Sequence, residues 1–218
     1  MNTFSRQIVG TVVALALCQP ISADETKEKT PHPGYRPESE LAADFIRTVT
    51  TAAVRVYPTI IRTPTNTFFS TESQEQIVEF LNRKKITKAI PADRSIDPGE
   101  LKGRGQFDWF TNDETVIGNE VKKERIREQY ALVMEVLFPP QRGNRQSVFG
   151  IHCIVLDTEG RRAFSFLLNS HHQMFVDTNM VADDLSNESR AELVHKATAL
   201  GLDALSQHIQ MARLKTPD

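Results

Sequence analysis

The apolar and polar positions from Pro37 onward follow two alternating periods, and this pattern predicts an α/β domain. Residues 41–49 place apolar side chains at helical spacing, whereas Val54–Arg62 is rich in β-branched residues, as strands are. Pro58 inside that strand indicates an edge position or a bulge. Tyr130–Phe138 is the clearest strand. The complete order predicts a mixed sheet of about five strands packed with helices, with a long C-terminal helix.

Capping motifs and short apolar runs place the remaining elements. Thr71–Gln74 and Ser189–Glu192 both fit the capping box, so we expect a helix to begin at each. The second of these helices contains Gly201, which either weakens the helix or permits a close approach to the sheet. Ile86–Ile90 predicts a short strand, and Met174–Met180 predicts another.

A hairpin is expected near the middle of the sheet. Its strands are Ser147–Leu156 and Arg162–Asn169, joined by the turn Asp157–Gly160. Counting back from that turn pairs Cys153 with Ser165. Because both faces of the hairpin are apolar, we expect other elements to cover both.

This order of elements resembles the amino-terminal domain of TolB and related lipoprotein modules of the bacterial envelope. The resemblance depends on the first strand followed by a helix at Thr71, on the strand Tyr130–Phe138 preceded by a helix, and on the hairpin with its turn in Val155–Gly160. It covers roughly residues 54–210 and is one of topology. It implies assembly with other envelope components and no enzymatic activity.

The first 23 residues have the pattern of a secretory signal peptide. Arg6 is the only charge before Asp24, an apolar run covers Ile8–Leu17, and small residues lead to a cleavage site after Ala23. The apolar run is shorter than the approximately 20 residues that a membrane-spanning helix needs. We therefore predict a periplasmic or secreted mature chain.

Signal cleavage would leave a flexible leader of residues 24–36 and a single domain of residues 37–218. Cys18 offers an alternative, an outer-membrane lipoprotein, but the bulky Leu17 stands where a lipidation signal has a small residue. If Cys18 leaves with the signal, Cys153 is the last cysteine and no intramolecular disulfide can form. A bacterial periplasm fits this better than a eukaryotic secretory route.

Charge adds little to this picture. The formal charge is -2, from 26 basic and 28 acidic residues, so composition predicts neither a nucleic-acid partner nor an anionic membrane surface. The glycine-containing loops lack the P-loop pattern, and we predict no cofactor.

Four side chains are candidate metal ligands, since zinc and copper prefer nitrogen and sulfur: His152, Cys153, His171 and His172. Neighbours on a strand point to opposite faces, so only one of each adjacent pair can serve. The alternative is that Cys153 is a buried apolar residue and His152 a hydrogen-bonded sheet residue. A third hypothesis makes Cys153 the nucleophile of a hydrolase, with His171 or His172 as its base.

One helix carries two further candidates. Trp109, the only tryptophan, points away from the face that Phe107 and Phe110 share and is a candidate anchor for a partner. Four carboxylates on the same helix are expected to form a solvated face: Asp108, Asp113, Glu114 and Glu120. The sequence as a whole favours a non-enzymatic binding or assembly module of the cell envelope, with a metalloprotein as the alternative.

Overall fold

The computed structural model describes residues 38–99, 106–140, 143–169 and 171–215. All of them belong to one compact unit, Arg36–Asp218. Of residues 38, 106–113 and 215 only the backbone is described. The predicted signal peptide, its cleavage site at Ala23, Cys18 and the leader lie outside the described residues.

The main sheet has seven strands arranged around β5 (Tyr130–Leu137). On one side β5 pairs antiparallel with β7 (Gly150–Asp157), and β7 pairs antiparallel with β8 (Arg162–Asn169). On its other side, the first half of β5 pairs in parallel with β1 (Ala53–Val56), and the second half with β2 (Thr59–Arg62).

The strand predicted at 54–62 is therefore two strands in line, interrupted at Tyr57 and Pro58. Proline has no N–H to donate to a neighbouring strand, which explains the break. The next position outward in the sheet is also occupied by two separate strands. β4 (Lys88–Pro91) pairs in parallel with β1, and β3 (Thr67–Ser70) pairs antiparallel with β2. The sequence pattern did not predict β3.

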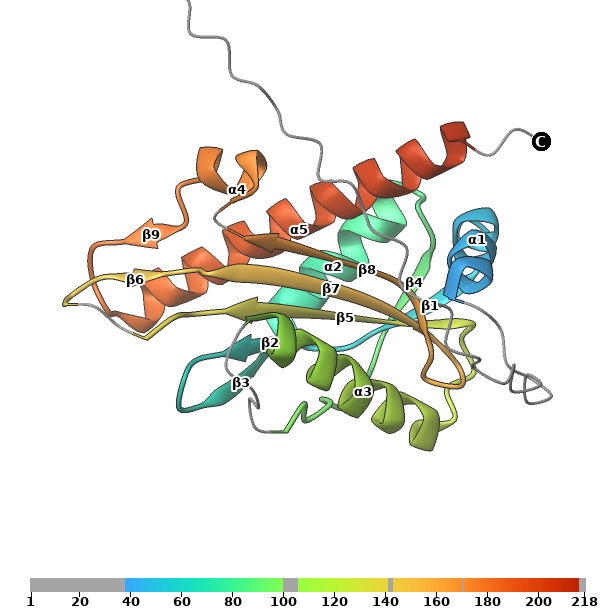
Figure 1. The fold of residues 1–218 in the computed structure, drawn as a ribbon, viewed down its shortest axis with the longest axis horizontal. Coiled ribbons are helices and arrows are strands. Elements are labelled where there is room, and N and C mark those ends of the chain that lie inside the picture. Colours follow the sequence, from blue (N-terminus) through green and yellow to red (C-terminus); the bar gives the residue numbers. More distant parts are fainter. Residues whose placement is uncertain (1–37, 100–105, 141–142, 170, 216–218) are drawn as a thin grey trace, which may run out of the picture. The chain divides into compact units, whose positions relative to one another are not determined.

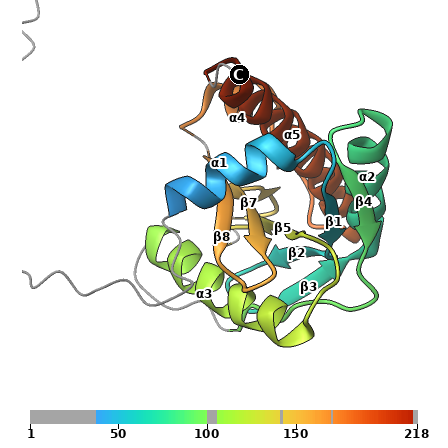
Figure 2. The ribbon, with the colours of Figure 1, turned by 90° about the vertical axis from the view of Figure 1, so that its right-hand side faces the viewer.

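Helices cover both faces of this sheet (Figures 1 and 2). One face is covered by α1 (Glu38–Thr48), α2 (Thr71–Arg83) and α5 (Asn187–Lys215), and the other by α3 (Gln106–Glu124). The predicted α/β class, mixed sheet and long C-terminal helix are confirmed. No helix of the described residues is both long and apolar enough to cross a membrane.

Two hydrophobic cores result, one on each face. The core beneath α1, α2 and α5 includes Cys153, Met134 and Ile151. The smaller core beneath α3 takes Ile117 and Val121 from the helix. All of β5 and β7 is buried, as expected for strands that are apolar on both faces.

One element in the last third of the chain is a helix where the sequence pattern predicts a strand. Residues 174–180 do not form a strand: α4 (Gln173–Asp177) occupies most of that segment. It leads into β9 (Val181–Ala182), which pairs with β6 (Gln146–Ser147) as a separate two-stranded sheet.

The predicted capping box of α2 is wrong. Ser70 is the N-cap, and its hydroxyl accepts a hydrogen bond from the Ser73 amide at 3.1 Å. Gln74 turns inward instead and donates to the carbonyls of Val56 and Ala92, at 2.8 and 2.9 Å. It thereby joins the last residue of β1 to the residue that follows β4.

The predicted start of the last helix also moves. The helix begins at Asn187, and the Ser186 hydroxyl accepts from the Ser189 amide at 3.1 Å. In both helices a serine just before the first turn is the capping residue, rather than the first residue of the predicted box. Gly201 lies against the sheet, as the second alternative predicted, because a Cβ there would be 3.0 Å from the Met134 methyl group.

The hairpin register is displaced by one residue from the prediction. Cys153 pairs with Phe166, and Ser165 pairs with Ile154. The cause is an irregularity between Val155 and Leu156, next to the turn. A bulge adds one residue to a strand, so counting back from the turn fails beyond it.

A close backbone contact fixes α3 to the hairpin turn. A Cβ added to Gly118 would lie 2.3 Å from the Gly160 carbonyl oxygen, and one added to Gly160 would lie 1.9 Å from that of Gly118. Gly160 also has a φ of +72°, as its tight turn requires. Only glycine at both positions allows this contact, which positions α3 over the sheet.

Candidate functional site

The underside of α3 holds two polar clusters, one at Glu114 and the other at Glu124. We name the cluster at Glu124 the charged pocket; it is lined by Arg55, Asp93, Arg94, Glu120, Lys123 and Glu124. We name the cluster at Glu114 the buried ion chain; it runs through Arg62, Glu135, His152, Glu114 and Arg162.

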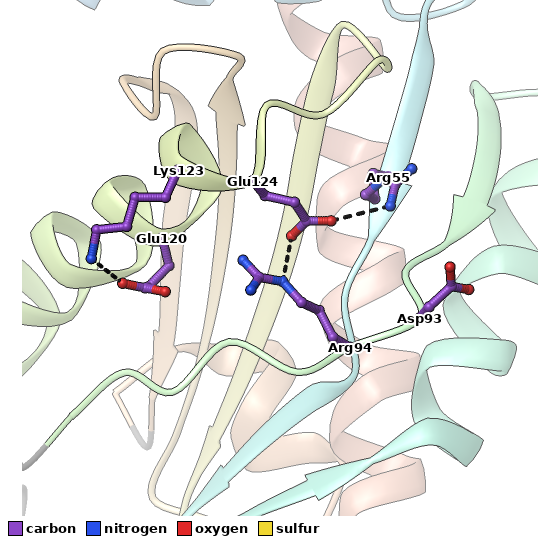
Figure 3. Close-up of a pocket in the computed structure, with 6 residues that line it drawn as sticks. All are labelled: Arg55, Asp93, Arg94, Glu120, Lys123 and Glu124. Carbon is purple, nitrogen blue, oxygen red and sulfur yellow. Dashed lines mark hydrogen bonds and ion pairs between the residues drawn. The ribbon is translucent and has the colours of Figure 1, made fainter.

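Glu124, at the last turn of α3, is the centre of the charged pocket (Figure 3). Its carboxylate accepts hydrogen bonds from Tyr57 Oη at 2.7 Å, Arg94 Nε at 2.8 Å and Arg55 Nη1 at 3.1 Å. Arg55 also donates to both carboxylate oxygens of Glu128, at 2.8 and 3.2 Å. These residues come from β1, from the segments after β1 and β4, and from the segment before β5.

Electrostatics fix the protonation states in this pocket. Burial raises the pKa of Glu124, but hydrogen bonds from Tyr57 and Arg94 and the charges of both arginines outweigh it, so the pKa is lowered overall. Burial and the neighbouring Glu124 carboxylate raise the pKa of the Tyr57 hydroxyl well above its ordinary value. At neutral pH Glu124 is therefore ionised and Tyr57 is neutral.

The charged pocket opens to solvent and has a volume of about 410 Å³. Lys123 and Glu120 form an ion pair of 2.6 Å on its α3 side. Lys123 also lines a second hollow of about 550 Å³ together with Asn119, Lys122 and Arg125. The open surface at the C-terminal end of α3 therefore carries both basic and acidic side chains.

The buried ion chain lies between α3 and the sheet. His152 on β7 places Nδ1 2.9 Å from Glu135 Oε2 and Nε2 3.2 Å from Glu114 Oε1. Arg162 on β8 donates to Glu114 Oε2 at 2.6 Å. At the other end, Arg62 Nη1 lies 3.8 Å from Glu135 Oε1.

His152 is 3% exposed, and its charge state follows from its two neighbours. Burial lowers its pKa, but hydrogen bonds and attraction from Glu114 and Glu135 together raise it to about 9. His152 is therefore protonated at neutral pH, with both ring nitrogens as donors. A protonated imidazole can act neither as a general base nor as a metal ligand.

Cys153 lies on the opposite face of β7, in the core beneath α5. It is fully buried, and burial raises the pKa of its thiol to about 12. A nucleophilic or metal-binding cysteine needs the thiolate, which this environment disfavours. In the described parts of the chain, no group of three or more His, Cys, Asp or Glu side chains is arranged to hold a metal ion.

His171 and His172 are exposed beside the start of α4. Burial, and to a lesser extent electrostatic repulsion from His172, lowers the pKa of His208 on α5. The His208 ring also contacts Phe166, with centroids 5.2 Å apart. This histidine neighbourhood is on the α5 side of the sheet, whereas His152 faces α3.

Two expectations about α3 have different outcomes. The side chains of Trp109, Asp108 and Asp113 lie outside the described residues, so the predicted partner anchor stays a prediction. The predicted solvated face is wrong for Glu114, which turns inward to His152. The sequence analysis did not identify Glu135 as a site residue. It is the single charged residue within the apolar strand Tyr130–Leu137, and this isolated charge could have indicated a buried polar site.

Comparison with known proteins gives only distant structural similarity. No family model matches the chain, and no curated protein matches it. Among solved structures, the chain is similar to the LpoB C-terminal domain from Salmonella enterica, with 12% identity over 60% of this chain and 93% of that domain. The TM-score is 0.32, too low to establish a shared fold. The resemblance to TolB-type domains stays a prediction.

Proposed function

We propose that this chain is a secreted, non-enzymatic binding module of the bacterial cell envelope and that a partner binds at the charged pocket. One observation carries the proposal. The candidate chemical groups from the sequence, His152 and Cys153, are buried in the interior, whereas five of the six side chains that line the open cavity form ion pairs with one another.

The groups in the pocket are poor catalysts. A general base works best with a pKa near the operating pH, and the lowered pKa of Glu124 makes it a weak base. The raised pKa of Tyr57 makes its hydroxyl a weak acid. Both side chains hold one another and Arg94 in place, which is the arrangement of a rigid binding surface.

The charge pattern indicates what such a surface would recognise. Arg55, Arg94 and Lys123 contribute three positive charges, and the carboxylates Asp93, Glu120 and Glu124 contribute three negative ones. A partner surface with both charges can exchange ion pairs with the exposed members of this set. Such complementary charges contribute mainly to specificity and to the rate of association.

The experiment is affinity capture of the mature chain from the envelope fraction, comparing two charge reversals. Lys123→Glu changes the pocket. Lys196→Glu is the matched control, because Lys196 is also a solvent-exposed helix lysine paired with a glutamate of its own helix, at 2.7 Å. We expect Lys123→Glu to lose a captured partner that native chain and Lys196→Glu retain. Equal capture by all three would refute the pocket as the binding site.

Location needs its own measurement. Expression of the full chain in a bacterium, followed by fractionation and N-terminal sequencing, should give a periplasmic product that begins at Asp24. Retention of residues 1–23 on a cytoplasmic product would contradict the secreted part of the proposal.

A further inference from the structure

We propose that the outer edge of β3 binds an extended, basic segment of a partner protein as an added strand. The inference rests on the proposed binding function and adds a second docking surface to it. β3 is the last strand of its row and pairs with β2 alone among the strands of the described sheet. An edge strand presents backbone N–H and C=O groups that another extended chain can match.

The side chains of β3 are unusual for an edge. Phe68 and Phe69 are 43% and 40% exposed. Since successive residues of a strand point to opposite faces, one ring lies on each side of the sheet. Natural edges usually carry charges that discourage pairing, whereas these two rings offer apolar contact on both faces of an added strand.

The surface continues from β3 onto α5. The Arg190 guanidinium lies 6.0 Å from the centre of the Phe68 ring. Arg190 Nε also donates to Gln146 on β6, and Gln146 donates to the Ser186 carbonyl at 3.0 Å. Val181 on β9, paired beside β6, is 44% exposed. The edge is therefore part of a larger partly apolar surface.

The charged side chains around the β3 edge indicate that a basic segment binds there. Four exposed carboxylates lie in the first turns of α2 and α5 and in the segment that joins β9 to α5: Glu72, Glu188, Asp183 and Asp184. Hydrogen bonds from the two serines Ser186 and Ser189 lower the pKa of Asp184, which keeps it ionised. Against these stand two guanidinium groups, Arg190 and Arg145, the latter paired with Asp183 at 2.8 Å. An acidic rim repels a second copy of the same surface and attracts lysine or arginine.

The test uses the purified mature chain and a labelled peptide of alternating lysine and valine, about six residues long, the usual length of a strand. Binding is measured by fluorescence anisotropy. We expect saturable binding that weakens with salt. Two further peptides are N-methylated at alternate residues, one on the odd positions and one on the even positions. If the peptide adds as a strand, one of them loses the N–H donors that face β3, and it should bind at least about tenfold more weakly than the other. Simple charge attraction would give both peptides the same affinity.

Protein variants locate the site. Phe69→Lys should weaken peptide binding about tenfold, whereas Leu214→Lys, at an exposed apolar position near the end of α5, should leave it unchanged. Thermal melts check that both variants fold. If Phe69→Lys does not fold, the N-methylated peptides decide the question on the native chain.

Three results would overturn the inference: no saturable binding, equal binding of both N-methylated peptides, or equal loss in the two variants. Sedimentation showing that the native chain forms a dimer broken by Phe69→Lys would also overturn it, in favour of a second copy. A negative peptide result beside partner capture that depends on Lys123 would refute only the β3 inference. The reverse combination would refute only the pocket.

Discussion

Protonation of His152 should make the stability of the fold depend on pH between about 6.5 and 9. The folded-state pKa of about 9 lies above the ordinary 6.5, so the protonated histidine binds its two glutamates more tightly in the folded chain. This stabilisation is fully present below pH 6.5 and is lost as the pH rises through 9. The difference between these two pKa values corresponds to about 3 kcal/mol of folding free energy.

The perturbation that isolates this contribution is His152→Gln. Glutamine keeps a hydrogen-bonding side chain of similar reach but cannot carry the positive charge between Glu114 and Glu135. Removing one partner from a buried ion pair leaves an uncompensated charge and costs about 3–5 kcal/mol. We therefore expect the variant to be less stable than the native chain by at least about 3 kcal/mol at pH 6 and by much less above pH 9.

The assay is urea denaturation of both proteins across that pH range, with the free energy of unfolding of the variant subtracted from that of the native chain. Subtraction removes lysines, tyrosines and other groups that titrate in both proteins. His195→Gln, at an exposed position on α5, serves as the control and should give a difference near zero. A difference between native and His152→Gln that stays constant with pH would refute a protonated His152.

Three other predictions concern buried residues. Gly160→Ala should lower the free energy of unfolding by more than about 2 kcal/mol, because its Cβ would strike the Gly118 carbonyl. Gly143→Ala, also at positive φ but with nothing within 4 Å, should lower it by about 1 kcal/mol, and equal losses in urea melts would contradict the close contact. Cys153 should react with a thiol reagent only after unfolding, and rapid reaction of the native chain would contradict its burial. Gln74→Ala should lower the free energy of unfolding by about 1–3 kcal/mol, because the Ala92 carbonyl loses its Gln74 donor while the Val56 carbonyl keeps the Ala92 amide at 2.8 Å. Gln76→Ala, on the same helix, should lower it clearly less in the same melts.

The fold was largely predictable because its strands and helices differ in period. β5 and the hairpin are continuous apolar runs, and the long C-terminal helix repeats apolar residues at helical spacing. The errors fall where a local choice depends on distant partners. Gln74 fits a capping box, but its side-chain amide instead donates to the carbonyls of Val56 and Ala92, which are distant in the sequence. A bulge beside the turn likewise leaves no clear mark in the sequence.

The candidate site was less predictable, since it joins segments far apart in the chain. His152 was recognised as a polar residue in a strand, but its partner Glu135 comes from β5 and Glu114 from α3. The sequence pattern did not single out Glu124, and the three donors around it come from β1 and from the segments after β1 and β4. Spacing along one element cannot reveal such convergence.

The two-part neighbour of β5 has a consequence for folding kinetics. Val54 of β1 pairs with Tyr130, and Ile60 of β2 pairs with Glu135, so the N-terminal strands must wait for a partner that is synthesised much later. The pairing of β5 with β7 closes a far shorter loop, from Leu137 to Gly150. Loop-closure entropy therefore favours a meander of β5, β7 and β8 as the first structure to form, onto which β1 and β2 dock afterwards.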